Sequence, residues 1–141
     1  MAGQFMSAEA KSDLQYEIGQ LDRLVHDLVD ALADAEPNAL YASHLSHLTH
    51  SFYNGFEKCL LFILTIRDLP KPSGNEWHRQ LIEQFQNELV DVMDTLKDLR
   101  GFRHVFRHTY YYELEFDQVK DVAIGIAPVW TTLKPWLESN L

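Results

Sequence analysis

Residues 45–66, LSHLTHSFYNGFEKCLLFILTI, decide the fold. Apolar side chains recur here at steps of three and four residues, which places them on one face of an α-helix. The second half, LLFILTI, is apolar nearly all round, which is typical of a helix that is covered on every side. We therefore expect a helix from about Leu40 to Leu69 to be the central element. Its stripe comprises Leu45, Leu48, Phe52, Phe56, Cys59, Ile63 and Ile66.

The same spacing precedes this segment. An amphipathic helix is expected in the first third of the chain, and Pro37 in AEPN (35–38) ends it, because proline cannot continue a helix. Acidic side chains lie mostly off its stripe. The stripe comprises Leu14, Ile18, Leu21, Val25, Leu28 and Leu32.

Further helices are expected after the loop PKPSGN (70–75). One begins near Glu76 and continues to about residue 99, and Gly101 then marks a break or bend before a short helix. A last helix covers roughly Asp117 to Trp136, and Pro128 should kink or restart it. The apolar stripe of the helix near Glu76 comprises Trp77, Leu81, Phe85, Leu89, Val92, Leu96 and Leu99.

The whole pattern predicts an all-α protein, an antiparallel bundle of four to five helices, and no segment alternates as a strand does. A chain of 141 residues is one domain by length. Its single cysteine, Cys59, cannot form an internal disulfide and is expected to be a buried apolar side chain. The longest apolar run, CLLFILTI, has eight residues, whereas a bilayer needs about 20. We expect a cytoplasmic protein with no membrane partner.

Charge is distributed unevenly along the chain. The formal net charge is −9, which disfavours broad adhesion to nucleic acid or anionic lipid. Residues 100–108, however, contain three arginines and no acid, a local charge of +3. A small positive patch on an acidic protein favours a defined contact with an anion.

That patch lies in RHVFRHTY (103–110), which contains the spacing R-x4-H-x-Y at Arg103, His108 and Tyr110. An arginine offers a fork of donors that fits a phosphate, and a histidine exchanges protons near neutral pH. These groups are the ones needed to cleave RNA without a metal. On an ideal helix, five residues span about 140°, so Arg103 and His108 do not share a face. Arg103, Arg107 and Tyr110 do share one.

The segment RHVFRHTYYYEL (103–114), which follows an all-helical region, resembles the HEPN superfamily, whose signature is an arginine and a histidine four to six residues apart. The form R-x4-H-x-Y is similar to HepT-type toxins, the ribonuclease partners of MNT-type minimal nucleotidyltransferases. GNEWHRQLIEQF (74–85) also resembles the opening of that family's third helix. The resemblance extends over essentially the whole chain, as a single HepT-like helical domain at 1–141.

The resemblance implies a metal-independent endoribonuclease toxin of a type II or type VII toxin–antitoxin pair, which needs no cofactor. Arg103 and His108 would be the catalytic pair, and Tyr110 the tyrosine that the nucleotidyltransferase antitoxin adenylylates. The active form would be a homodimer in which the motifs of two subunits face one RNA.

Several positions around the motif leave its details open. Candidate contacts to RNA or phosphate are Arg100, His104 and Arg107. The family commonly has a small polar residue after the arginine, whereas this chain has His104, a second titratable group. Tyr111 and Tyr112 follow directly, so either is an alternative site of modification.

Two rival interpretations remain. A HEPN-like bundle can bind a nucleotide or a partner protein without cleaving anything. His44, His47 and His50 could alternatively ligate a metal, although no carboxylate lies among them. Trp77 and His78, after the loop, are expected to begin a helix with the indole in the core.

Overall fold

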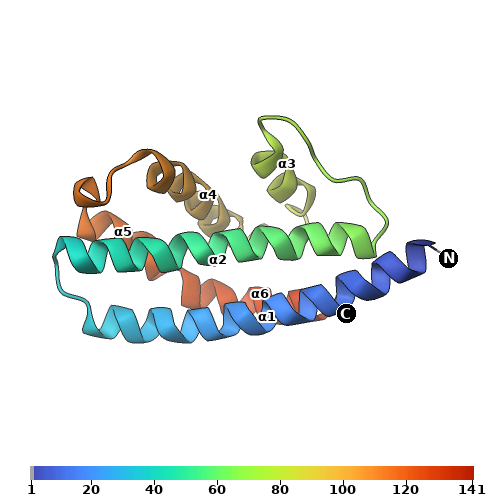
Figure 1. Ribbon diagram of the computed structural model, residues 1–141, viewed down its shortest axis with the longest axis horizontal. Coiled ribbons are helices and arrows are strands. Elements are labelled where there is room, and N and C mark those ends of the chain that lie inside the picture. The colour runs from blue at the N-terminus through green and yellow to red at the C-terminus, as the bar shows by residue number, and fades with distance from the viewer. Residues whose placement is uncertain (1) are drawn as a thin grey trace.

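The computed structural model describes residues 2–141 and is helical throughout, with no strand among the described residues (Figure 1). The sequence prediction of an all-α bundle is therefore confirmed. The elements are α1 (Ala2–Asp34), α2 (Ala39–Ile66), α3 (Trp77–Gln84), the 3₁₀ turn η1 (Val90–Val92), α4 (Met93–His108), the 3₁₀ turn η2 (Tyr111–Glu113), α5 (Phe116–Ala123) and α6 (Ile126–Glu138).

Helix α2 is the central element, as its apolar composition predicts. It lies beside α1 over most of its length, and α3, α4 and α5 also pack against it (Figure 1). Helix α6 packs mainly on α1. The side chain of Asn38 caps α2 by accepting a hydrogen bond from the backbone of Tyr41 at 3.0 Å.

Close contact between α1 and α2 depends on a glycine. A β-carbon built on Gly55 would lie 2.6 Å from Cδ2 of Leu21, which is buried. Only a residue without a side chain lets the two backbones approach at this point. The Cys59 thiol lies in the same core, and burial raises its pKa to about 12. The cysteine is thus an inert core residue, as expected.

A polar contact joins α1 to α6. Asp22 accepts hydrogen bonds from the indole of Trp130 at 2.9 Å and from Nζ of Lys134 at 3.1 Å. These bonds, the indole bond first, lower the pKa of Asp22. The ring of Trp130 in turn packs edge-on against Phe52 of α2, at 5.8 Å between centroids. One tryptophan therefore links three helices.

The prediction of one helix over 76–99 is wrong. Helix α3 ends at Gln84, turns follow, and α4 begins only at Met93. Phe85, Leu89 and Val92 are buried all the same, because the turns bring them to the side that faces the core. The apolar residues therefore keep a helical spacing across the break, and this spacing does not predict it.

The expected break at Gly101 is also wrong. Helix α4 continues through this position to His108. A glycine inside a helix costs about 1 kcal/mol relative to alanine, a cost that the packing of α4 offsets. Leu96, Leu99 and Phe102 supply that packing, since all three are buried.

The expected restart near Pro128 is confirmed. Helix α5 ends at Ala123 and α6 begins at Ile126, which places Pro128 in the first turn, where a missing N–H breaks no helical hydrogen bond. No described helix is both long enough and apolar enough to cross a bilayer.

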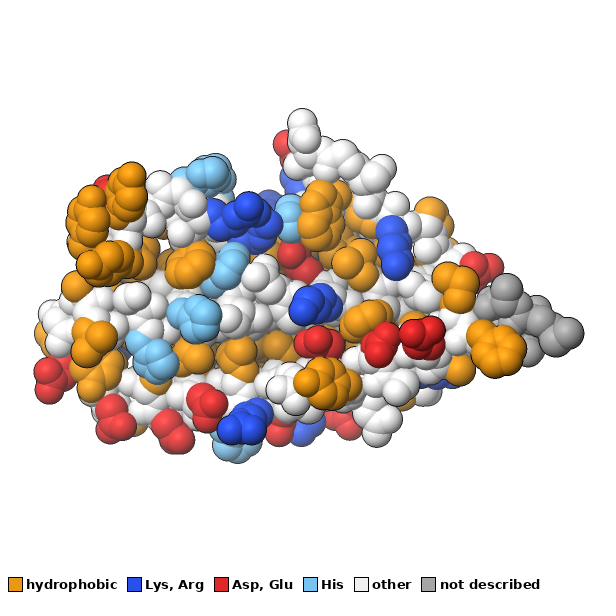
Figure 2. Space-filling model, in the orientation of Figure 1, with side chains coloured by type: hydrophobic (Ala, Val, Ile, Leu, Met, Phe, Trp, Pro, Cys, Tyr) orange, Lys and Arg blue, Asp and Glu red, His pale blue; other side chains and the backbone are white. Residues whose placement is uncertain are grey.

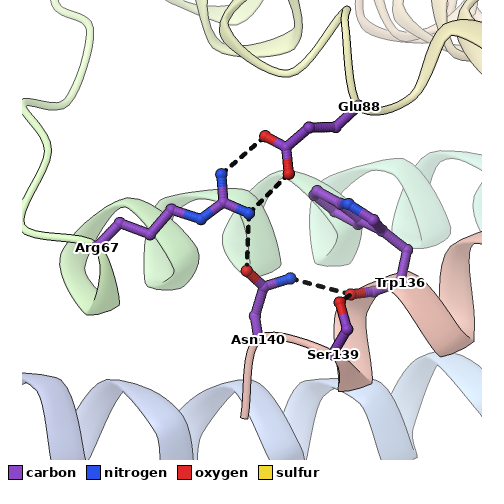
Figure 3. Close-up of polar contacts among 5 residues, drawn as sticks. All are labelled: Arg67, Glu88, Trp136, Ser139 and Asn140. Atoms are coloured by element: carbon purple, nitrogen blue, oxygen red, sulfur yellow. Dashed lines mark hydrogen bonds and ion pairs between the residues drawn. The ribbon is translucent and has the colours of Figure 1, made fainter.

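A polar clamp fixes the break between α3 and α4 (Figure 3). Arg67, which follows α2, donates two hydrogen bonds of 2.7 Å to the Glu88 carboxylate and one of 2.9 Å to the side chain of Asn140. The amide of Asn140 donates to the backbone carbonyl of Trp136 at 2.9 Å. The clamp thus joins the end of α2, the α3–α4 connection and the end of α6.

We expect Glu88→Gln to lower the free energy of unfolding by about 0.5–1 kcal/mol at pH 7, since the pair is bidentate but partly exposed. The hydrogen bonds from Arg67 lower the pKa of Glu88, so the pair stabilises the fold above the unfolded pKa of about 4.3. This contribution is lost as the pH falls through the folded pKa. Urea denaturation at several pH values measures it.

The matched control is Glu138→Gln, because this carboxylate forms no ion pair with the described residues. A stability loss in Glu88→Gln that is as large at pH 3 as at pH 7 would contradict the prediction.

Candidate active site

The C-terminal half of α4 carries the arginines and histidines of the motif. Helix α4 ends at His108, and Thr109 is extended, with φ −120° and ψ 134°. Arg107 and His108 lie in the last turn, where the negative end of the helix dipole favours cations. The core contacts of Leu99 and Phe102 therefore fix the direction in which the motif residues project.

Tyr110 does not continue the helical face of Arg103 and Arg107, so that expectation is wrong. Its backbone is extended, with φ −65° and ψ 145°, because the chain leaves the helix at Thr109. Tyr110 is 69% exposed, and its ring stacks on Tyr112 with centroids 5.5 Å apart and planes within 5°. Tyr111 meets Tyr112 edge-on at 5.5 Å. The three tyrosines form an exposed aromatic cluster.

The motif lines two hollows. The α3–α4 hollow, of about 310 Å³, is lined by Asn75, Glu76, His78, Arg79, Arg100, Gly101, Arg103 and His104. The tyrosine hollow, of about 350 Å³, is lined by Arg107, His108, Thr109 and Tyr110.

Arg103 and His108 thus lie in different hollows, in agreement with their helical spacing. The link between them is His104, whose ring centroid lies 4.4 Å from that of His108. A larger hollow of about 540 Å³ beside α5 contains none of the arginines or histidines of the motif.

No carboxylate within residues 2–141 forms an ion pair with Arg100, Arg103 or Arg107. The Nε atom of Arg103 is buried and has no hydrogen-bond partner. Buried donors are nearly always satisfied, so this N–H is available to a water molecule or to a ligand. Figure 2 shows Lys, Arg and His side chains grouped between α3 and α4, whereas acidic side chains line the α1 edge.

His50 of α2 belongs to this site, as a histidine that borders a pocket would. Its ring stacks on Phe106 at 4.5 Å between centroids, and Asn54 lies 3.0 Å from its Nε2. Burial lowers the pKa of His50, and the charges of Arg103 and Arg107 lower it further. His50 is therefore a neutral imidazole held against the motif helix.

A buried carboxylate also lies beside the site. Glu57 of α2 is 3% exposed, and its Oε2 lies 2.6 Å from Nδ1 of His78, at the start of α3. The hydroxyl of Tyr53, one turn earlier, is buried, and burial together with the charge of Glu57 raises the pKa of Tyr53. The face of α2 towards α3 and α4 is thus a polar stripe. It comprises Ser46, Thr49, His50, Tyr53 and Glu57.

The structure also locates the other residues that the sequence singled out. Trp77 packs partly buried against the core, as predicted, but its ring also lies 3.5 Å from that of His78. Phe102 is buried within the chain and Phe106 is half-buried on His50, whereas Val105 is exposed. His44 and His47 are exposed. The described residues contain no group of three metal-ligating side chains that could hold an ion.

The chain is an all-α bundle, and its R-x4-H motif lies at the end of a helix beside two hollows that arginines and histidines line. These are the features of the HEPN class of helical proteins. The HepT-like protein family matches residues 44–140, from α2 to the end of α6. The chain belongs to this family, and is thus a HepT-type HEPN protein. Searches of curated proteins and of solved structures gave no significant match.

We expect Arg103→Gln and Arg107→Gln each to raise the pKa of His50, because each removes a positive charge that disfavours the imidazolium. A proton NMR titration measures the shift, with the resonance assigned from the spectrum of His50→Gln. Arg23→Gln on α1 removes the same charge elsewhere and serves as the control. An unchanged pKa of His50 in both motif variants would contradict the arrangement.

Proposed function

We propose that this protein is a metal-independent endoribonuclease and the toxin of a toxin–antitoxin pair. The main support is that Arg100, Arg103 and Arg107 on α4 form no ion pair within residues 2–141. The rings of His104 and His108 lie in contact beside them. Membership of the HepT-like family supports it. Arg103 and His108 are the proposed catalytic residues.

The proposed reaction is attack by a ribose 2′-oxygen on the adjacent phosphorus. The O2′–P bond forms and the P–O5′ bond breaks, which leaves a 2′,3′-cyclic phosphate and a 5′-hydroxyl. His108 accepts the proton of the 2′-hydroxyl, and the leaving 5′-oxygen takes a proton from a second imidazole or from water. The Arg103 guanidinium binds the phosphoryl oxygens, whose negative charge increases in the transition state.

A second copy of the chain completes the proposed site. Arg103 and His108 line separate hollows in one chain, so one phosphate between them needs a further surface. Exposed Val105 lies between them on α4 and is a suitable contact for a two-fold dimer. Such a dimer would bring two Arg103–His108 pairs to one RNA.

The tyrosine cluster supports single-stranded RNA as the substrate. Tyr110, Tyr111 and Tyr112 are each more than 60% exposed, and their rings already stack on one another. Exposed aromatic rings bind unpaired bases by stacking, largely without regard to sequence. The acidic remainder of the chain disfavours extended binding, which limits contact to this surface.

The second candidate function is a HEPN-type module that binds RNA or a partner without cleavage. The depressed pKa of His50 beside two arginines is compatible with binding alone. A 2′,3′-cyclic phosphate product distinguishes the two functions, because only a nuclease forms it.

We expect His108→Ala to reduce RNA cleavage by about 10²–10⁴-fold, because an acid–base group is lost. Arg103→Lys should retain part of the activity and Arg103→Ala less, because a point charge does not reproduce the fork of donors. Cleavage should persist in excess chelator. Gel assays of a labelled oligonucleotide measure all three.

The control is His44→Ala, which removes an exposed histidine near the start of α2. Full activity in a folded His108→Ala protein would refute the catalytic assignment, and activity lost with chelator would refute metal independence.

We also propose that a nucleotidyltransferase antitoxin silences the protein by adenylylating Tyr110. The hydroxyl-bearing ring is exposed, and Tyr110 shares a hollow with Arg107 and His108. An attached AMP would place its phosphate beside Arg107 and fill this hollow with a base and a ribose. Both effects exclude RNA and leave the core untouched.

We expect a gain of one or more AMP masses when the protein is incubated with the partner enzyme and ATP, and none in Tyr110→Phe. Intact-mass spectrometry measures it. Tyr111→Phe and Tyr112→Phe are the controls and should be modified normally. Modification that persists in Tyr110→Phe would move the site to a neighbouring tyrosine.

A further inference from the structure

We propose that the α3–α4 hollow is a second phosphate subsite, which binds a phosphodiester of the RNA strand next to the one that is cleaved. His78 and Arg100 are its direct contacts, and Glu57 is a positioning residue. The proposal rests on the proposed RNA cleavage, since it assigns a further part of the same substrate.

The charges around the hollow favour an anion. Arg79 projects from α3, and Arg100 and Arg103 project from α4. Among the described residues that line the hollow, Glu76 is the acid, and it is already engaged by Nε of Arg79 at 2.9 Å. Arg100 and Arg103 have no such partner within residues 2–141. A phosphate, with several acceptor oxygens, satisfies the fork of Arg100, while Arg103 at the edge of the hollow remains available to the phosphate that is cleaved.

His78 is held with one ring nitrogen towards the hollow. Its Nδ1 lies 2.6 Å from the Glu57 carboxylate, which fixes the orientation of the ring. No hydrogen bond within the described chain engages Nε2, although the ring lines the hollow. Nε2 can donate a hydrogen bond to a phosphate oxygen when both ring nitrogens carry hydrogen, and the Glu57 carboxylate then balances the charge of the ring.

Burial of the Glu57 carboxylate costs folding free energy, and packing alone does not explain why it is buried. It is 3% exposed on the central helix, and a buried carboxylate destabilises a fold unless it is paired and hydrogen-bonded. A pair of this kind is often no more stable than apolar residues of the same size. What the pair does achieve here is to tie α3 to α2 and to orient His78.

The hollow lies at a suitable distance from the catalytic end of α4. Arg100 and His108 are eight residues apart, which is about 12 Å along a helix. Arg103 lies between them, lines the hollow, and has a buried Nε without a partner. An RNA strand that follows α4 therefore contacts the α3–α4 hollow with one phosphate and the tyrosine hollow with a later part of the chain.

The test measures binding separately from cleavage. A fluorescein-labelled 2′-O-methyl RNA hexamer lacks the nucleophilic hydroxyl, so its affinity is read by fluorescence anisotropy whether or not the protein is a nuclease. We expect His78→Gln and Arg100→Gln each to weaken binding about tenfold. Each should also reduce the slope of log affinity against log salt by about 0.7. Arg23→Gln, which removes a charge from α1, is the matched control.

Glu57→Gln tests positioning in the same assay. Its effect should be strongly non-additive with that of His78→Gln in a double-mutant cycle, because Glu57 acts through His78. Arg100→Gln leaves the Glu57–His78 pair intact, so it keeps the test decisive if the other variants lose stability in thermal melts.

Kinetics distinguish this subsite from the catalytic residues. On cleavable RNA, Arg100→Gln should raise KM with little change in kcat, whereas His108→Ala should lower kcat. A wild-type protein that cleaves no RNA would refute the proposed function but leave the anisotropy test valid. Wild-type affinity in both His78→Gln and Arg100→Gln, or an equal loss in Arg23→Gln, would overturn the subsite.

Discussion

The structure depends on one constraint: helix α2 is buried on two sides, of which one is apolar and the other is polar. One side meets α1 and α5 and is apolar, and Gly55 lets α1 approach closely. The other side carries the polar stripe from Ser46 to Glu57 and faces α3 and α4. Buried polar atoms reduce stability unless they are bonded. Within the described chain Glu57 has His78 as a partner, whereas the buried hydroxyls of Ser46 and Thr49 have none. The candidate site lies on this side of α2. His78, which lines the α3–α4 hollow, and Phe106 of the motif helix both contact residues of the stripe.

Periodicity predicted much of the fold because it reports local geometry. The stripes through Leu14–Leu28 and Leu45–Ile63 gave α1 and α2, whose apolar faces are buried as expected. The break after Gln84 was not predictable, because Phe85, Leu89 and Val92 keep the helical spacing while the backbone turns. A non-local contact lies at the break, since Arg67, 21 residues earlier, binds Glu88. Gly101 shows the converse, a local signal for a break that packing overrides.

The candidate site was predictable as a segment but not as an arrangement. Residue types and spacing in RHVFRHTY identified the motif and placed Arg103 and His108 on different faces, which the two hollows confirm. The contributions of His50 and Glu57 come from another helix, and no spacing within the motif reveals them. The tyrosines were misplaced for a local reason, since the chain becomes extended at Thr109 without a proline or glycine to mark it.

The contact between Trp77 and His78 gives the protein an intrinsic optical signal. Their ring centroids are 3.5 Å apart, so the emission of this indole is sensitive to what surrounds the imidazole. Trp130 and Trp136 pack against Phe52 and Phe85 instead and supply a background. Emission intensity thus reports changes around a single histidine that lines the α3–α4 hollow. Ligand entry becomes observable in stopped-flow experiments without a dye.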